Sequence, residues 1–449
     1  MVHQNSKELQ PQAITNWSMA RKIWLFFITI YFSFLVLDFT SSDEIFPHFI
    51  YWLFTHYVNF WNWMVPWTGK HILHLGYPIT VLPNGSGDTT YNYVLQLLWI
   101  VLPLIIGVTW ALLDRKRISY NSLAYWVRII VRYYLAIILC SYGFSKVIQL
   151  QFPAPTLYRL MQAYGDSSPM GLAWTFLGYS KGYNFFIGSA EVLAGLLLLF
   201  KRTTLIGSLI AMTVLMNVAA MNFAYDIPAK IYSVNLVIIA AWLAWYDIKR
   251  LINLLILNKI ALPARLAMPA QKRWKKILQA TLKIVAVCFI LYSTLGQSMI
   301  SYNKYVSGAP KSPLYGIYNV ETFIKNKDTL PPLTTDTARW KQMVIEYPGY
   351  VWFKSMADST NGFVIKLDTI KHTAVLHSYK DSTKTFGFNY SKPDKDHLIF
   401  TGYAPYLFDK KFRDFKTDSL VIVMKRFDEN KFRLVNRGFH WINEYPYNR

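Results

Sequence analysis

Long apolar segments with few charges recur along the first two-thirds of the chain, and short polar stretches separate them. Several approach the ~20 residues that a helix needs to cross about 30 Å of hydrocarbon. Two of them are separated only by Lys201 and Arg202, which fits a tight helical hairpin. The pattern predicts an α-helical polytopic membrane bundle with about seven transmembrane helices, at residues 23–39, 91–113, 125–149, 184–200, 203–223, 229–247 and 277–297.

The pattern changes after residue 300. Short segments rich in aromatic and β-branched residues, such as YVWFKSM (350–356) and SLVIVMKRF (419–427), alternate with stretches of Asp, Lys, Pro, Ser and Asn. Segments of this length and composition predict antiparallel strands joined by hairpins. We therefore expect an all-β antiparallel barrel or sandwich at 300–449, with a lipocalin-like architecture.

Two apolar segments between the predicted spans are less regular. Residues 45–69 carry no Asp, Glu, Lys or Arg and are dense in Trp, Tyr and Phe, whose rings favour the headgroup level of a bilayer. We expect an interfacial or re-entrant helix there. Residues 150–183 are predicted as an outer loop whose helical stretch, PMGLAWTFLG (169–178), folds back onto the bundle.

The distribution of charge predicts the orientation. The chain carries 47 Lys/Arg and 25 Asp/Glu, a net charge of +22. With a cytoplasmic N-terminus, sixteen basic residues fall in the inner segments, and only Lys70, Arg159 and Lys181 fall in the short outer loops. This is the positive-inside pattern of a membrane protein, so the excess charge indicates a bilayer as the partner and not nucleic acid.

The expected organisation follows from the spans and this orientation. The β domain is placed outside the cytoplasm, because an odd number of spans separates it from the N-terminus. The predicted parts are a cytoplasmic N-terminus (1–22), a first transmembrane helix with an outer aromatic segment (23–90), a helical membrane core (91–252), a basic cytoplasmic linker (253–276), a last transmembrane helix (277–299) and the β domain (300–449).

Polar side chains inside the apolar segments form the candidate site, because charge in hydrocarbon is unfavourable and such residues usually pair or carry function. Arg132 and Lys146 lie on one predicted helix and Glu191 on the next. Lys146 and Glu191 both lie towards the outer leaflet, where they could pair. The pair is read either as a salt bridge that locks two helices or as a site that handles protons or quinone.

A second polar group surrounds an expected turn at Pro228. Asp226 and Lys230 flank the proline, which predicts a short outer hairpin held by an Asp–Lys pair, with a ligand-facing rim as the alternative. Asn217 and Asn222 are placed to hydrogen-bond across helices. With the first group, the predicted polar cluster comprises Arg132, Lys146, Glu191, Asn217, Asn222, Asp226 and Lys230.

No cofactor motif is evident in the sequence. His71 and His74 lack a partner pattern typical of zinc, and Cys140 and Cys288 lie in separate apolar segments, so we predict no metal site and no redox disulfide. A quinone from the bilayer is compatible with the polar cluster.

Several strings between residues 84 and 252 resemble the DoxX-like family of membrane proteins. They are YGFSK (142–146), AEVLAGLLLLFKRT (190–203) and NVAAMNFAYDIPAK (217–230). NGSGDTT (84–90), QFPAPT (151–156) and YGDSSPMGLAWTFLGYS (164–180) resemble a longer bacterial subgroup of that family. The resemblance implies a multi-pass protein of the bacterial cytoplasmic (inner) membrane, with its β domain in the periplasm. The family is named for a subunit of an archaeal thiosulfate:quinone oxidoreductase, and other members are linked to redox stress at the envelope.

Three functions are compatible with these residues. The favoured one is a non-catalytic or accessory envelope component, whose bundle is an anchor and whose β domain binds an envelope protein or a lipophilic ligand. The alternative is a quinone-linked membrane oxidoreductase, or a subunit of one, in which Lys146 or Arg132 stabilises a quinol anion and Glu191 moves protons. A transporter ranks last, because the sequence shows no inverted repeat.

Overall fold

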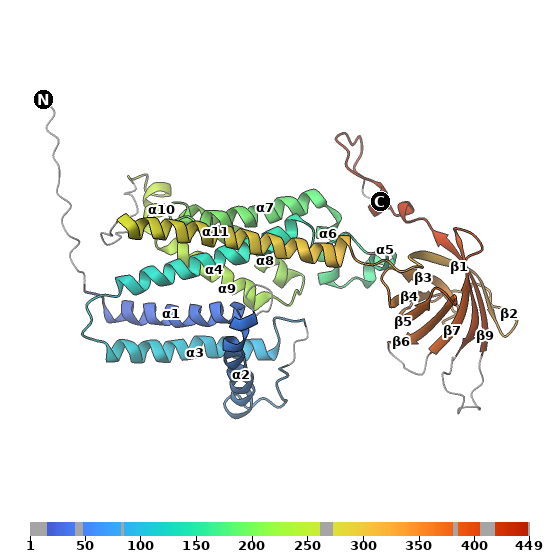
Figure 1. Ribbon diagram of the computed structural model, residues 1–449, viewed down its shortest axis with the longest axis horizontal. Coiled ribbons are helices and arrows are strands. Elements are labelled where there is room, and N and C mark those ends of the chain that lie inside the picture. Colours follow the sequence, from blue (N-terminus) through green and yellow to red (C-terminus); the bar gives the residue numbers. More distant parts are fainter. Residues whose placement is uncertain are drawn as a thin grey trace. The chain divides into compact units, whose positions relative to one another are not determined.

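The computed structural model describes residues 16–40, 48–81, 85–260, 273–379, 385–404 and 418–447. The chain divides into two compact units (Figure 1). The helical unit comprises residues 1–151 and 182–301, and the barrel unit comprises residues 152–181 and 302–449. The barrel unit therefore takes one segment from between two helices of the helical unit.

The helical unit contains a helix at each segment where the hydrophobic pattern predicts one. Among the described residues, five helices are long and apolar enough to cross a membrane, and α9 with α10 forms a sixth candidate that bends by 71°. This is the composition of a multi-pass membrane protein. The helices are α1 (Met19–Thr40), α2 (His48–His71), α3 (Thr90–Leu113), α4 (Asn121–Val147), α7 (Lys181–Leu198), α8 (Thr204–Ala224), α9 (Lys230–Trp245), α10 (Ile248–Leu255) and α11 (Arg273–Tyr302).

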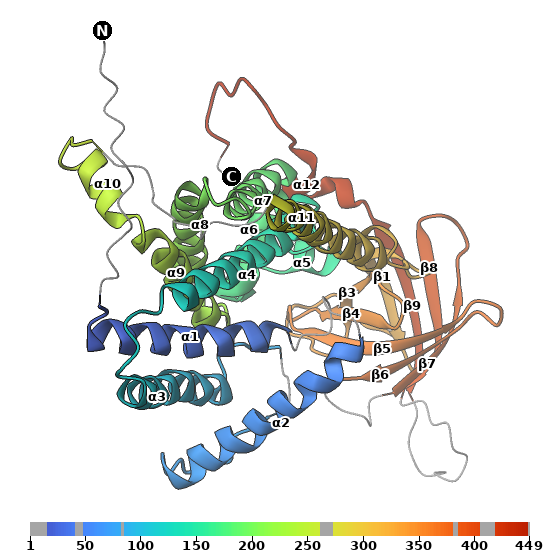
Figure 2. The same cartoon turned by 60° about the vertical axis from the view of Figure 1, so that its left-hand side comes forward.

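The aromatic segment predicted at 45–69 forms α2. This helix runs across the direction of α1 and α3 (Figures 1 and 2). It contains Pro66, and its Trp61 ring packs against Phe34 of α1 and Trp99 of α3, with ring centroids 5.3 and 6.1 Å apart. α2 is not among the helices that qualify as spans. An interfacial or re-entrant position remains a prediction.

α4 and α7 pack backbone against backbone. A Cβ atom on Gly188 would lie 2.6 Å from the carbonyl oxygen of Gly143, and one on Gly195 would lie 2.8 Å from the sulfur of Cys140. Because residue numbers rise along α4 as they fall along α7, the two helices are antiparallel. Small residues allow this approach, which gives the van der Waals contact that drives helix association in lipid.

The barrel unit confirms the predicted all-β domain and decides for a barrel over a sandwich. Among the described residues, nine strands form one antiparallel sheet, and eight of them close because β9 pairs back with β1. The order is that of an up-and-down meander, with the two-residue β2 beside β1. The strands are β1 (Gly316–Lys325), β2 (Asp328–Thr329), β3 (Trp340–Ile345), β4 (Tyr350–Ser355), β5 (Thr360–Asp368), β6 (Thr373–Ser378), β7 (Thr385–Ser391), β8 (His397–Ala404) and β9 (Asp418–Phe427).

The interior of the barrel is packed with side chains. Trp340 stacks on Phe353 with ring centroids 3.8 Å apart and meets Phe388 edge-on. Met343 and Phe400 are fully buried in the same core. An eight-stranded barrel is just wide enough for side chains to fill it. A lipophilic ligand inside a lipocalin-like cavity is therefore not favoured by this packing.

Arg339 is buried with this core and is 2% exposed. Its guanidinium donates to the carbonyl oxygens of Leu330 (3.1 Å), Trp340 (3.3 Å) and Glu321 (3.3 Å). Burial lowers the pKa of Arg339, and the charge of Asp336 opposes that shift. Backbone dipoles thus surround this cation where an ion pair could have been expected.

The segment 152–181 belongs to the barrel unit, where we expected an outer loop folded back onto the bundle. The predicted helix at 169–178 is present as α6. Leu157 of α5 is buried against Ile317 and Val344, which point outward from the barrel wall. The segment contains α5 (Leu157–Met161), the 3-10 turn η1 (Tyr164–Asp166) and α6 (Pro169–Tyr179), and the unit also holds η2 (Asn303–Ser307), η3 (Glu429–Lys431) and α12 (Arg433–Asn436).

Candidate functional site

Lys146 and Glu191 form the ion pair that the sequence suggested. The Lys146 ammonium donates to both carboxylate oxygens of Glu191, at 2.9 and 2.7 Å, and the two side chains are 6% and 3% exposed. Each residue lies one turn beyond a glycine of the α4–α7 contact, Gly143 or Gly188. The close backbone approach therefore places the two charges face to face, and the pair fastens the two helices together.

An aromatic ring lies beside this ion pair. The ammonium of Lys146 lies 5.5 Å from the centroid of the Tyr142 ring, and Tyr142 lies beside Tyr232 of α9 with centroids 6.3 Å apart. A buried ion pair with its hydrogen bonds made and aromatic neighbours on the lysine has the geometry of a structural link. Both side chains are almost completely buried, and the carboxylate faces its lysine.

Arg132 lies in a different part of α4. Fourteen residues separate it from Lys146, which corresponds to about 21 Å along a helix. Its Nη1 donates to the Thr204 hydroxyl at 3.4 Å, at the start of α8, and its guanidinium lies 5.2 Å from the Tyr133 ring. The predicted cluster therefore does not converge on one site.

Three of the remaining predicted residues, Asn222, Asp226 and Lys230, lie around the turn between α8 and α9. Lys230 binds the Asp226 carboxylate at 2.8 Å, and the Asn222 amide donates to the carbonyl oxygen of Ala229 at 3.1 Å. The expected Asp–Lys hairpin pair is confirmed. Asn217 lies on the exposed surface of α8, away from this group.

Asp88 caps the start of α9, a role that the sequence reading missed. Its carboxylate oxygens accept from the backbone N–H groups of Lys230 (2.8 Å) and Ile231 (3.0 Å). A carboxylate is favourable at a helix N-terminus because the first N–H groups have no partner within the helix. The sequence signal for this capping role was the Asp within the turn-like NGSGDTT string (84–90).

A closed ring of hydrogen bonds links α1, α3 and α9. The Tyr31 hydroxyl donates to Asn235 Oδ1 at 2.6 Å, Asn235 Nδ2 donates to Gln96 Oε1 at 3.0 Å, and Gln96 Nε2 donates to the Tyr31 hydroxyl at 2.9 Å. Two amides inside apolar segments were the signal for this ring in the sequence. Because each member is satisfied by the others, the ring acts as a structural link.

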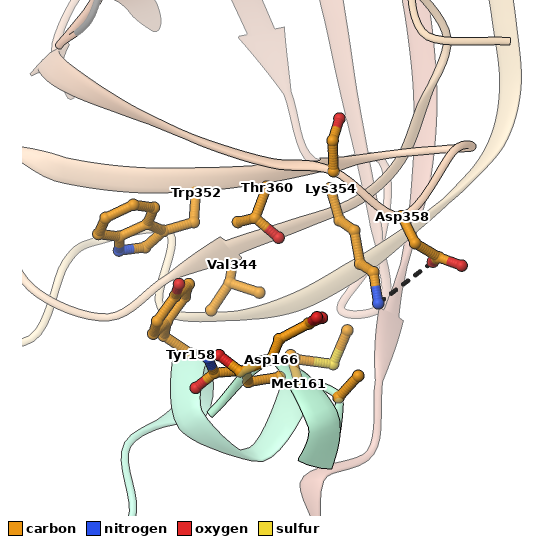
Figure 3. Close-up of a pocket in the computed structure, with 11 residues that line it drawn as sticks. Tyr158, Met161, Asp166, Val344, Trp352, Lys354, Asp358 and Thr360 are labelled. Atoms are coloured by element: carbon orange, nitrogen blue, oxygen red, sulfur yellow. Dashed lines mark hydrogen bonds and ion pairs between the residues drawn. The ribbon is translucent and has the colours of Figure 1, made fainter. Parts of the chain in front are cut away.

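An open cavity of about 320 Å³ lies in the barrel unit, on the outer wall of the barrel. We call it the groove. Figure 3 shows α5 and η1 on one side and strands β3 to β5 on the other. Tyr158 and Trp352 form an aromatic wall, with ring centroids 4.6 Å apart. The groove is lined by Tyr158, Met161, Gln162, Ala163, Asp166, Val344, Trp352, Lys354, Asp358, Ser359 and Thr360.

Charges at the groove largely neutralise one another. Asp358 accepts from Lys341 at 2.8 Å and lies 3.2 Å from Lys354 (Figure 3). Hydrogen bonds from these two lysines hold the pKa of Asp358 below its usual value. Asp166 adds a carboxylate from the opposite side. The groove therefore offers hydrogen-bonding groups on both sides and little net charge.

Glu346 lines a second, smaller cavity of about 150 Å³ that shares Tyr158 and Trp352 with the groove. One carboxylate oxygen accepts from the backbone N–H of Leu157, at the start of α5, at 3.2 Å. Burial raises the pKa of Glu346 to about 7, and the hydrogen bond from Leu157 limits the increase. This carboxyl group therefore titrates near neutrality while it holds α5 on the barrel.

The described residues show no group of three or more His, Cys, Asp or Glu side chains placed to hold a metal ion. His71 and His74, the closest pair in the sequence, are both exposed.

Comparison with known proteins gives one relative of uncharacterised activity. The chain is 35% identical over 123 residues to the uncharacterised protein YwoB of Bacillus subtilis (strain 168). The match covers 27% of this chain and 78% of the relative. No known family model and no solved structure matches the chain.

Proposed function

The chain belongs to the same family as YwoB of Bacillus subtilis, and on that premise we propose that it is a non-catalytic or accessory envelope component with a ligand-binding barrel unit. The helical unit is a DoxX-like anchor in the bacterial cytoplasmic membrane. The N-terminus lies in the cytoplasm and the barrel unit in the periplasm. The groove on the barrel wall is the ligand-binding site.

One contrast supports this proposal. The ion pair of the helical unit, Lys146 with Glu191, is buried and satisfied by its own hydrogen bonds. The groove, in contrast, is open and combines an aromatic wall with polar groups on both sides. Binding sites for small molecules typically have this mixture of a flat apolar surface and a few polar groups that fix orientation.

The chemistry of the groove favours a neutral saccharide. The electron-rich faces of Trp352 and Tyr158 suit the C–H groups on one face of a sugar ring. The carboxylate of Asp166 and the hydroxyl of Thr360 suit the hydroxyl groups at its edge. Because Lys354 is already paired with Asp358, an anionic ligand would find little uncompensated charge.

The test is calorimetric titration of the full chain with neutral disaccharides, namely diacetylchitobiose, maltose and cellobiose. The protein is held in lipid nanodiscs, because maltoside detergents carry the same ligand class. We expect binding by the wild type, at least tenfold weaker binding by Trp352→Ala, and partial retention by Trp352→Phe. Trp441→Ala, which removes a tryptophan that is 90% exposed, is the matched control and keeps full affinity.

Two results would oppose the proposal. If no disaccharide binds, or if Trp352→Ala binds as well as the wild type, the groove is not a saccharide site. Mass spectrometry of lipids extracted from the purified protein addresses the oxidoreductase alternative. A quinone retained by the wild type and lost from Glu191→Gln would favour that alternative over an anchor.

A further inference from the structure

Four basic side chains gather at one end of the helical unit. Arg128 and Arg132 lie on α4, Lys201 lies in the turn between α7 and α8, and Lys283 lies on α11. The Lys283 ammonium is 4.6 Å from the centroid of the Phe200 ring, which places α11 beside that turn. Arg132 reaches the same turn through Thr204. We call Arg128, Arg132, Lys201 and Lys283 the basic cluster.

The acidic residue that pairs with this cluster is Asp247, and it is shared between two arginines. Asp247, at the bend between α9 and α10, accepts from Arg128 at 3.2 Å and from Arg250 at 2.7 Å. Neither Arg132 nor Lys283 forms an ion pair with a described carboxylate. The cluster therefore keeps uncompensated positive charge in a partly buried environment, where like charges repel strongly.

Arg132 carries the clearest sign of a missing partner. The residue is 8% exposed, and its buried Nε donates to no described atom. A guanidinium has five N–H donors in a planar fork that matches the oxygens of a phosphate or carboxylate. A buried donor without an acceptor is unfavourable, so an acceptor is expected from outside the chain.

The positive charge of the two arginines also affects the pKa of the neighbouring Lys201. Burial lowers the pKa of Lys201, and the guanidinium groups of Arg132 and Arg128 lower it further. Its ammonium lies 5.9 Å from the centroid of the Tyr125 ring, and Arg128 lies 4.4 Å from that of Tyr246. Tyrosine rings beside basic side chains are typical of the headgroup level of a bilayer.

We propose that the basic cluster binds the phosphate group of an anionic phospholipid, with Arg132 as the central ligand and Lys283 and Lys201 as flanking cations. Basic pockets between transmembrane helices on the cytoplasmic side commonly hold such headgroups. A bound phosphate accepts from the Arg132 fork and neutralises the charge that Asp247 leaves uncompensated. The site is independent of the saccharide groove and requires only that the helical unit is in a bilayer.

The test is thermal unfolding of the full chain in a neutral detergent, titrated with dioleoyl phosphatidylglycerol, with dioleoyl phosphatidylcholine or with inorganic phosphate. A ligand that binds only the folded state raises the unfolding temperature as its concentration rises. We expect phosphatidylglycerol to stabilise the wild type, with half of the effect at a concentration about tenfold lower than in Arg132→Gln. Lys116→Gln, in the exposed loop before α4, is the charge-matched control and behaves as the wild type.

Each other outcome bears on the proposal. Equal responses of the wild type and Arg132→Gln would overturn it, and so would equal stabilisation by phosphatidylcholine. Stabilisation by millimolar inorganic phosphate alone, as large as that by the lipid, would assign the site to a soluble anion. If Arg132→Gln does not fold, Lys283→Gln tests a half-buried member of the cluster, and the same tenfold weakening is expected.

Discussion

Two buried cations, one in each unit, find different acceptors. In the helical unit, the Lys146 ammonium is buried against a carboxylate that supplies two acceptors, Glu191. In the barrel unit, the Arg339 guanidinium is buried among carbonyl oxygens of the backbone. The first arrangement joins two helices, whereas the second fixes loops and strand ends of a single sheet.

The difference follows from the number of backbone carbonyl groups that each fold leaves without a hydrogen-bond donor. Helices satisfy most of their own carbonyl groups, and the ammonium of Lys146 finds its acceptor on a side chain. Turns and strand ends of a barrel leave carbonyl groups without ladder partners, and a planar guanidinium can collect several of them. The same need to satisfy a buried cation is therefore met by a carboxylate at Lys146 and by backbone carbonyl groups at Arg339.

The largest expected effect comes from removing one member of the helical pair. Lys146→Met leaves the Glu191 carboxylate buried and unpaired, which should destabilise the helical unit by about 3–5 kcal/mol. Thermal unfolding in detergent measures the loss. The double variant Lys146→Met/Glu191→Leu should recover most of it, and Asp226→Asn, at the exposed pair, should leave the unfolding temperature unchanged. If the double variant remains as unstable as the single one, the pair is not a simple structural link.

A smaller loss is expected from the barrel cation. Arg339→Leu leaves carbonyl oxygens without a donor and should destabilise the barrel unit by about 2–3 kcal/mol. Arg339→Lys should recover only part of this, because one ammonium cannot span the same carbonyl groups. Lys425→Leu, on the exposed side of β9, is the control. Full recovery by lysine would show that charge, and not the fork geometry, matters here.

The helical contact that aligns Lys146 with Glu191 predicts a third effect. Gly188→Ala places a methyl group against the backbone of α4 and should destabilise the helical unit by about 1–2 kcal/mol. Gly182→Ala, on the same helix with open space around it, should be neutral or slightly stabilising. Equal unfolding temperatures for the two variants would mean that α4 and α7 do not approach as closely as described.

The smallest effect is a pH dependence confined to the barrel unit. Glu346 has a pKa of about 7 when folded and near 4.5 in an exposed chain, so the folded state binds more protons between these values. Stability should therefore fall as pH rises from about 4.5 to about 7, by roughly 1 kcal/mol after allowance for solvent screening. Glu346→Gln should remove this slope in denaturation curves recorded from pH 4 to 8. A slope that persists in this variant would have to come from another group.

Much of the fold could be predicted from hydrophobic patterns because these patterns record burial directly. The length of the apolar segments indicated the helices. The alternation of short aromatic and β-branched segments with polar stretches indicated the strands of residues 316–427. Barrel closure was left open against a sandwich, because it depends on pairing between β1 and β9, whose residues lie about a hundred positions apart. The segment 152–181 was placed with the wrong partner because its apolar residues indicate burial but not the surface that buries them.

The candidate site was predictable only in part. The Lys146–Glu191 and Asp226–Lys230 pairs could be inferred from opposite charges in suitable positions. Grouping Arg132 with them ignored the fourteen residues of helix between Arg132 and Lys146. The groove had no signal at all, because Tyr158 and Trp352, which form its aromatic wall, lie almost two hundred residues apart in the chain.

The docking of α5 on the barrel has a consequence for biosynthesis. The hydrogen bond from Leu157 to Glu346 joins residues that are 189 positions apart, and five helices of the helical unit, α7 to α11, are translated between them. A ribosome therefore releases the α5 segment long before its docking surface on β1 and β3 exists. A truncated gene product that begins at residue 300 would have the reverse defect: its strands could close, but Ile317 and Val344 would face solvent. Expression of the barrel alone should therefore require residues 152–181, supplied in the same polypeptide or in trans, to stay soluble.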